Sequence, residues 1–193
     1  MRIITGSAKG TKLKAPRGLD TRPTTDRVKE SIFNILGNAV DGASVLDLFA
    51  GTGGLGLEAL SRGATHAVFV DQSLASIAVI KENIACTKMA EKAEIVKNDV
   101  IKTLEKLSDK AYFFDIVFCD PPYNKGYVTK VLQKLDTGSI LNPQSILIIE
   151  HSRHEVLDDV KWNNLILKRN ERYGETLVSF FIYNSQQSNE AED

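Results

Sequence analysis

The segment Asp120-Pro121-Pro122-Tyr123 brings together groups that can act on a planar amine. It ends an apolar run, residues 113–120, which predicts a buried strand. The two prolines lack backbone N–H groups and keep the chain extended. The Asp120 carboxylate and the Pro121 carbonyl can then accept both hydrogens of one NH2 group, while Tyr123 lies flat against the ring that carries it. We expect these four residues to be catalytic and to direct the amine lone pair at a methyl donor.

A second cluster is the glycine pattern Gly51-x-Gly53-x-x-Gly56. It lies between a predicted strand, residues 44–49, and a predicted helix, residues 55–62. Glycines in such a loop let the backbone turn sharply and approach a ligand at the helix N-terminus. The pattern alone fits either a nicotinamide dinucleotide or S-adenosylmethionine.

Three aspartates stand where three successive predicted strands end: Asp47, Asp71 and Asp99. A carboxylate at position 47 would repel a pyrophosphate, whereas a ligand with a sulfonium and an ammonium group would attract it. Asp71 can accept hydrogen bonds from ribose hydroxyls, and Asp99 can accept one from an adenine amine. Asp71 does not distinguish the two ligands, since both contain a ribose, whereas Asp47 favours S-adenosylmethionine over a dinucleotide.

Short apolar runs alternate with helical patterns from residue 44 onward, which predicts an α/β protein with a doubly wound, mostly parallel sheet. Two last β-like runs, 164–172 and 176–184, flank Tyr173-Gly174 and predict an antiparallel hairpin. The remaining predicted strands are 66–71, 93–99 and 145–150, and the remaining predicted helices are 73–89, 101–107 and 127–135.

The N-terminal region has a different charge from the rest of the chain. Residues 1–29 hold eight Lys or Arg against two Asp, whereas the other residues hold 16 basic and 23 acidic groups. Residues 1–20 predict a small β-hairpin, and a helix is expected to begin at residues 24–26 and to end at Gly37. Such a basic arm suits a polyanion. The candidate RNA contacts are Lys9, Lys12, Lys14, Arg17, Arg22 and Arg27.

Composition sets the remaining limits. The 193 residues are 42% hydrophobic and 25% charged, as in a globular domain, and no apolar run reaches the length of a membrane span. The N-terminus lacks an apolar signal region, which predicts a cytoplasmic protein. Cys86 and Cys119 are expected to be reduced core thiols. The three histidines show no metal-ligand spacing, so we expect no metal, and we expect His151 to lie on the surface.

These motifs carry a family resemblance. Asp47-Leu-Phe-Ala-Gly-Thr-Gly, Asp71, Asp99 and Asp120-Pro-Pro-Tyr resemble the class I S-adenosylmethionine-dependent methyltransferases that modify exocyclic or amide nitrogens. More narrowly, residues 21–36 and 45–63 are similar to the small bacterial 16S rRNA guanine-966 N2-methyltransferases. The resemblance implies a seven-stranded Rossmann-like sheet whose last strand is antiparallel. It also implies S-adenosylmethionine as donor and a guanine of small-subunit rRNA as acceptor.

The resulting expectation divides the chain into a hairpin and helix extension (1–40), a methyltransferase domain (41–184) and an acidic, disordered tail (185–193). The expected partner is 16S rRNA within an assembling small ribosomal subunit, and the protein is expected to be a monomer. Other acceptors stay open, namely adenine N6 of DNA or RNA and a protein glutamine amide, as does an RNA-binding module without catalysis. The predicted cofactor site comprises Asp47, Phe49, Gly51, Gly53, Asp71, Gln72, Asp99 and Val100.

Overall fold

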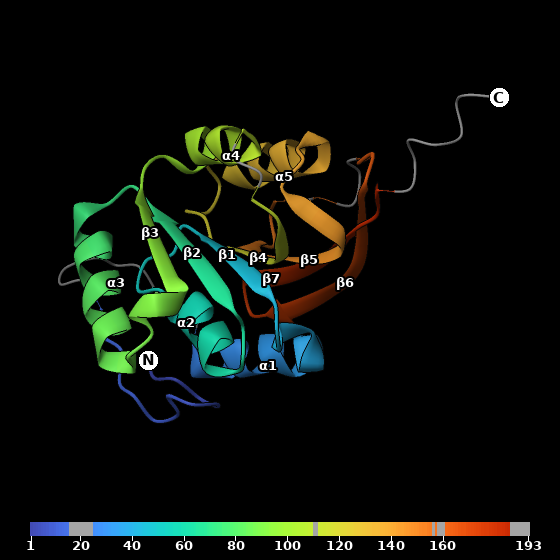
Figure 1. The fold of residues 1–193 in the computed structure, drawn as a ribbon. Helices are drawn as coiled ribbons and strands as arrows, with labels where there is room; N and C mark the ends of the chain where they lie inside the picture. The colour runs from blue at the N-terminus through green and yellow to red at the C-terminus, as the bar shows by residue number, and fades with distance from the viewer. Residues whose placement is uncertain (16–24, 110–111, 156, 158–160, 186–193) are drawn as a thin grey trace. The chain divides into compact units, whose positions relative to one another are not determined.

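The computed structural model describes residues 1–15, 25–109, 112–155, 157 and 161–185 (Figure 1). The chain forms two compact units, Met1–Asp99 and Val100–Asp193. Among the described residues, no helix has the length and apolarity needed to cross a membrane. The predicted boundaries of the extension and the methyltransferase domain stay a prediction, and the predicted tail lies outside the described residues apart from Ser185.

The first unit begins with the expected hairpin. Arg2 and Lys12 form an antiparallel bridge, and the Ile3 amide donates to the Thr11 carbonyl at 3.0 Å. The first helix, α1, follows as Asp26–Leu36. It begins where predicted because the Thr25 hydroxyl accepts a hydrogen bond from the Val28 amide at 3.3 Å, which satisfies one of the unpaired donors of the first turn.

Three parallel strands make up the sheet of the first unit, in the order β3-β2-β1. The central residues of β1 and β2 are buried because apolar side chains occupy successive positions, as expected for strands covered on both faces, whereas β3 is half-buried. The elements after α1 are a 3-10 turn (Gly37–Val40), β1 (Ser44–Leu48), α2 (Gly54–Ser61), β2 (His66–Asp71), α3 (Leu74–Thr87), a second 3-10 turn (Ala90–Lys92) and β3 (Ala93–Lys97).

The second unit has strand order β4-β5-β7-β6, in which β5 is parallel to β4 and antiparallel to β7. The predicted terminal hairpin is confirmed, since β6 and β7 pair antiparallel. The elements of this unit are α4 (Val100–Ser108), β4 (Phe114–Cys119), α5 (Tyr127–Thr137), β5 (Leu141–Ser152), β6 (Leu165–Tyr173) and β7 (Thr176–Tyr183).

Strand β5 is longer than the sequence predicts. It already pairs through Leu141 with Phe114, and the register then shifts before Ile146 pairs with Ile116. The irregularity accommodates Gln144, which has a positive φ of 67°. Asn142-Pro143-Gln144 has the composition of a turn, so the pattern alone indicated a later start for the strand.

A buried carboxylate attaches the hairpin to α2. Glu58 is fully buried and accepts hydrogen bonds from the backbone amides of Ile4 at 2.8 Å and Thr5 at 3.0 Å. The same carboxylate pairs with the fully buried Lys29 ammonium at 3.2 Å and with the Arg62 guanidinium at 2.9 Å. Burial lowers the pKa of Lys29, while the neighbouring Glu58 carboxylate opposes this shift. One side chain therefore holds the hairpin, α1 and α2 together.

The hairpin also lies directly against the last turn of α2. The Ser7 amide donates to the Ser61 carbonyl at 2.8 Å, and the Ser61 hydroxyl donates to the Thr5 carbonyl at 2.6 Å. A Cβ atom at Gly6 would lie 1.7 Å from the Ser61 carbonyl oxygen, so only glycine fits this approach.

One prediction about the core is wrong. Both cysteines were expected in the core, and Cys119 is buried there, but Cys86 is exposed.

We expect Glu58→Ala to destabilise the protein strongly, by about 3–5 kcal/mol, because it leaves the buried Lys29 ammonium without its carboxylate. Urea unfolding followed by circular dichroism measures this loss. A matched control is Glu82→Ala, which breaks an exposed ion pair with Lys14 and is expected to cost far less, because water screens an exposed pair. Equal losses in the two variants would contradict a central structural role for Glu58.

Candidate functional site

The loop after β1 is held by backbone conformation and by one carboxylate. Phe49 and Gly51 both have a φ of 56°, and Gly53 has a φ of 74°. Such angles are unstrained for glycine but uncommon for phenylalanine. The Gly51 amide donates to Asp71 Oδ2 at 2.9 Å, which connects the loop to the end of β2.

Asp71 uses both carboxylate oxygens to hold backbone amides. While Oδ2 accepts from Gly51, Oδ1 accepts from the Ser73 amide at 2.8 Å, just before α3 begins. The Asn98 amide donates to the Asp71 carbonyl at 3.1 Å, so the end of β3 lies beside the end of β2. Each carboxylate oxygen has a further lone pair. Half-buried Asp71 can therefore also accept hydrogen bonds from the hydroxyls of a ribose.

The loop glycines differ in what surrounds them. A Cβ at Gly56 would lie 2.4 Å from the Phe69 ring, and one at Gly54 would lie 2.4 Å from Met1 Sδ. At Gly51, by contrast, the nearest atom would be the Phe49 carbonyl oxygen at 3.8 Å. Gly56 therefore allows α2 to pack on β2, whereas the space beside Gly51 is open. An open backbone cradle next to a hydrogen-bond acceptor fits the predicted cofactor.

Asp47 has a different environment from Asp71. It is buried, and its Oδ2 accepts a hydrogen bond from the Gly56 amide at 2.9 Å within the first turns of α2. Burial raises the pKa of Asp47 to about 7, the Gly56 amide opposes this shift, and the Asp71 charge adds to it. The side chain thus fixes the start of α2 relative to β1. It does so while titrating near neutral pH.

The other predicted cofactor residues are divided between the two units. Asp99 is half-buried and follows β3 by two residues, and Gln72 is exposed between β2 and α3. Val100 is buried and begins α4 in the second unit. The first unit therefore brings together Asp47, the glycine loop and Asp71, and their predicted roles toward a ligand stay predictions.

In the second unit, Tyr123 is anchored through its hydroxyl group. The hydroxyl donates to Glu150 Oε1 at 3.0 Å and lies 3.1 Å from the Thr176 hydroxyl. Burial raises the pKa of Tyr123 above its ordinary range, and the Glu150 and Asp120 carboxylates raise it further. The hydroxyl therefore stays protonated, and the ring is held at its far end while 37% of the residue remains exposed.

The three residues before Tyr123 differ in their exposure. Pro121 is buried, Pro122 is exposed and Asp120 is half-buried directly after β4. His151, expected on the surface, is 1% exposed, and its Nε2 lies 2.7 Å from the Ser179 hydroxyl on β7. That prediction is wrong because β5 continues past Glu150 and pairs with β7 along its whole end.

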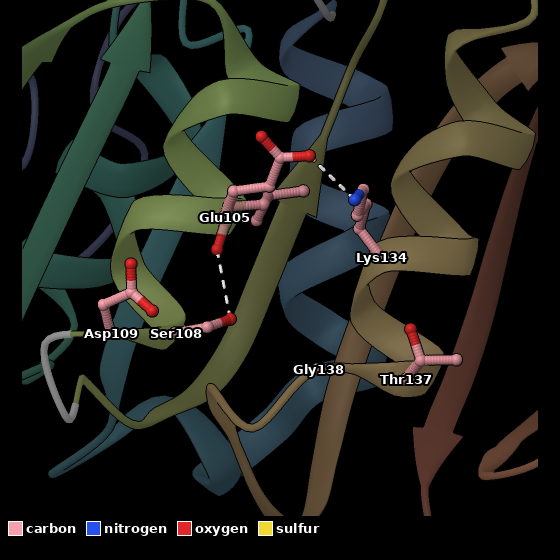
Figure 2. Close-up of a pocket in the computed structure, with 7 residues that line it drawn as sticks. Glu105, Ser108, Asp109, Lys134, Thr137 and Gly138 are labelled. Carbon is pink, nitrogen blue, oxygen red and sulfur yellow. Dashed lines mark hydrogen bonds and ion pairs between the residues drawn. The ribbon is translucent and has the colours of Figure 1, made fainter.

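A hollow of the second unit lies away from these motifs. Figure 2 shows it between α4 and α5, where Glu105 and Lys134 form an ion pair of 2.8 Å. None of the predicted site residues lines it. The described residues include no group of three or more histidine, cysteine or acidic side chains that can hold a metal ion.

The predicted RNA contacts are only partly within the described residues. Lys9, Lys12 and Arg27 are exposed, whereas Arg17 and Arg22 lie outside the described residues. Lys14 is also exposed, but its ammonium pairs with Glu82 at 2.8 Å, which raises the pKa of Lys14. A phosphate would have to compete with Glu82 for this lysine.

A family model described as Conserved hypothetical protein 95 matches residues 1–182. The chain belongs to this family. The Escherichia coli protein named Ribosomal RNA small subunit methyltransferase D is 33% identical over 192 residues, 100% of this chain and 93% of that protein. YlbH of Bacillus subtilis is 41% identical over 181 residues, 94% of this chain and 98% of that protein.

The fold agrees with this membership. The solved structure of YhhF from Escherichia coli has a TM-score of 0.83 and 33% identity, and the match covers 96% of this chain and 99% of that one. The chain is a methyltransferase with the α/β fold of class I enzymes, whose seven strands are mostly parallel. The predicted fold class and enzyme class are confirmed.

Three contacts at the site were not predicted from the sequence. Asn83 donates to the Thr52 carbonyl at 2.9 Å inside the glycine loop, and Glu150 and Thr176 hold the Tyr123 hydroxyl. Asn83 had a visible signal, since it interrupts the apolar face of α3 between Ile80 and Ile84. The partners of Tyr123 had none, because they lie on strands far along the chain.

We expect Asp47→Asn to remove a pH dependence of stability. A folded-state pKa near 7, above the ordinary value, means that the free energy of unfolding falls as pH rises from about 4 to 7. The amide oxygen of asparagine can still accept from Gly56 and does not titrate. Relative to the wild type, the variant should gain roughly 4 kcal/mol across this window. Urea unfolding at several pH values measures the gain, and parallel pH profiles would contradict the assignment.

Proposed function

We propose that this methyltransferase transfers the methyl group of S-adenosylmethionine to the exocyclic N2 of a guanine in small-subunit rRNA. The observation that carries the proposal is the match along the whole chain to a protein named Ribosomal RNA small subunit methyltransferase D. We further propose that the enzyme is cytoplasmic and that it acts as a monomer on an assembling small ribosomal subunit. The basic arm supports a nucleic acid over a glutamine amide as substrate.

S-adenosylmethionine is the methyl donor, and it supplies an electrophilic methyl group. Asp71 would accept the hydroxyls of its ribose, because both carboxylate oxygens are already oriented by backbone amides. The open backbone at Gly51 would lie against it, and Asp99 would accept its adenine amine. Phe49, Gly53, Gln72 and Val100 complete the proposed set, and Asp47 keeps the start of α2 in place beneath it.

Asp120 and the Pro121 carbonyl would accept the two hydrogens of the guanine amine. Formation of the new N–CH3 bond, with the S–CH3 bond of the donor breaking and S-adenosylhomocysteine leaving, would place positive charge on that nitrogen. The Asp120 carboxylate would stabilise this charge and take up the proton that the nitrogen releases. This contact is strongest in the transition state, so it acts on turnover. Tyr123 would lie against the guanine ring with its hydroxyl held by Glu150 and Thr176. The guanine must leave its stack in the RNA to reach this position.

We expect Asp120→Ala to lower kcat at least a hundredfold while the affinity for S-adenosylhomocysteine stays within twofold, since the carboxylate acts mainly in the transition state. The matched variant is Tyr123→Phe, which keeps the ring but loses both hydroxyl contacts. It should raise the KM for RNA more than it lowers kcat. Radiolabelled methyl transfer to small-subunit RNA gives kcat and KM, and calorimetry gives the cofactor affinity.

Nucleoside mass spectrometry of the product tests the acceptor atom directly. N2-methylguanosine made by the wild type and absent with Asp120→Ala is the expected result. N6-methyladenosine, or label found only in protein, would overturn the proposed acceptor. A normal rate with Asp120→Ala would overturn the proposed role of this carboxylate.

We further expect the exposed arm lysines to contact phosphate. Each such contact adds about 0.7–0.9 to the slope of log affinity against log salt concentration. Replacing Lys9 and Lys12 together by alanine should therefore flatten the slope by roughly 1.4–1.8. Glu82→Ala is the opposite test, because it releases Lys14 from its ion pair and should steepen the slope. RNA affinity over a salt series measures both, and unchanged slopes would show that the arm does not contact phosphate.

A further inference from the structure

Asn83 joins two segments of the first unit that are far apart in the sequence. It is fully buried on α3. Its Oδ1 accepts from the Lys14 amide at 2.8 Å, and its Nδ2 donates to the Lys14 carbonyl at 3.1 Å. The same Nδ2 donates to the Thr52 carbonyl at 2.9 Å. One amide group therefore holds both the end of the hairpin and the middle of the glycine loop.

A second contact connects the same two segments. Met1 Sδ lies 3.7 Å from the Thr52 hydroxyl. It also occupies the position beside Gly54, where a Cβ would lie only 2.4 Å from the sulfur. Thr52 stands between Gly51 and Gly53, so both contacts connect the hairpin to the same residue of the proposed cofactor loop. A displacement of Lys14 would therefore also displace the glycine loop.

The two segments have separate tasks in the proposed function. The hairpin carries Lys9 and Lys12, which would hold RNA, and the loop would hold the methyl donor. We propose that Asn83 is a positioning residue that couples these two binding events, so that RNA and the methyl donor each bind more tightly when the other is bound. This inference rests on the proposed function.

The physical basis is the shared cost of ordering the two segments. A ligand that fixes the loop also fixes Thr52, and through Asn83 it fixes the backbone at Lys14. The second ligand then orders fewer groups on binding, which gives positive coupling without a large change in structure. Coupling of this kind is commonly about 5- to 150-fold and is equal in both directions.

The test measures the affinity for S-adenosylhomocysteine by calorimetry, with and without a saturating transcript of small-subunit rRNA. In the wild type we expect RNA to tighten this affinity at least fivefold. In Asn83→Ala the ratio should fall to within twofold of one, while each ligand still binds alone. A merely structural role would weaken both ligands without changing the ratio.

The matched control is Thr87→Val, one helical turn further along α3. The buried Thr87 hydroxyl donates to the backbone carbonyls of Asn83 at 2.8 Å and of Ile84 at 3.1 Å, both within α3. Its loss should leave the coupling ratio unchanged. Where Asn83→Ala does not fold, Asn83→Asp removes the amide donor to both the Thr52 and the Lys14 carbonyls at similar volume, and it should lower the ratio in the same way.

The outcomes are separable. Wild-type coupling in a folded Asn83 variant, or a ratio of one in the wild type with both ligands bound, would overturn the proposal and leave the proposed function intact. Failure of the wild type to bind either ligand would overturn the proposed function itself. A reciprocal measurement, RNA affinity with and without S-adenosylhomocysteine, must give the same factor, and a different factor would also count against coupling.

Discussion

The packing of the first unit depends on the partners that surround the buried carboxylate of Glu58. Glu58 carries a charge with no access to water, and such a charge is tolerated only when partners surround it. Two hairpin amides, an ammonium and a guanidinium supply those partners. Because Glu58 lies on α2, which begins at the glycine loop, a basic hairpin in another position would leave this carboxylate without two of its four partners.

Carboxylates also have a structural role at the strand ends, where they accept hydrogen bonds from backbone amides. Asp71 accepts from Gly51 and Ser73, and Asp47 accepts from Gly56. The loop can therefore keep open space beside Gly51 without collapsing into it. This arrangement affects how a substitution at Asp71 is interpreted. Such a substitution changes the geometry of the glycine loop as well as any direct contact between Asp71 and a ligand. A change in ligand affinity therefore reports the direct contact only when the loop geometry is unchanged.

The regular elements could be predicted from the sequence because periodicity and caps are local signals, as the Thr25 cap and the terminal hairpin show. The glycine loop and the Asp120–Tyr123 motif were found for the same reason. What could not be predicted depends on distant partners. The prediction that His151 is exposed was wrong because β7, which buries it, lies far from residue 151 in the sequence. Asn83 itself could be noticed as a polar residue on the apolar face of α3, but its partners Lys14 and Thr52 lie 69 and 31 positions away in the sequence, too far for a local pattern to identify them.

The terminal hairpin shows how topology can serve a site. Strand β7 lies between β5 and β6 in the sheet. Its pairing with β5 places Thr176 opposite Ser152 at the end of β5. Thr176 and Glu150 thus lie close enough to hold one phenolic hydroxyl between them. A tyrosine fixed at its hydroxyl as well as at its backbone loses little further freedom when a base lies against its ring. In the proposed function, the antiparallel strand of an otherwise parallel sheet would therefore hold the ring of Tyr123 in place before the substrate binds.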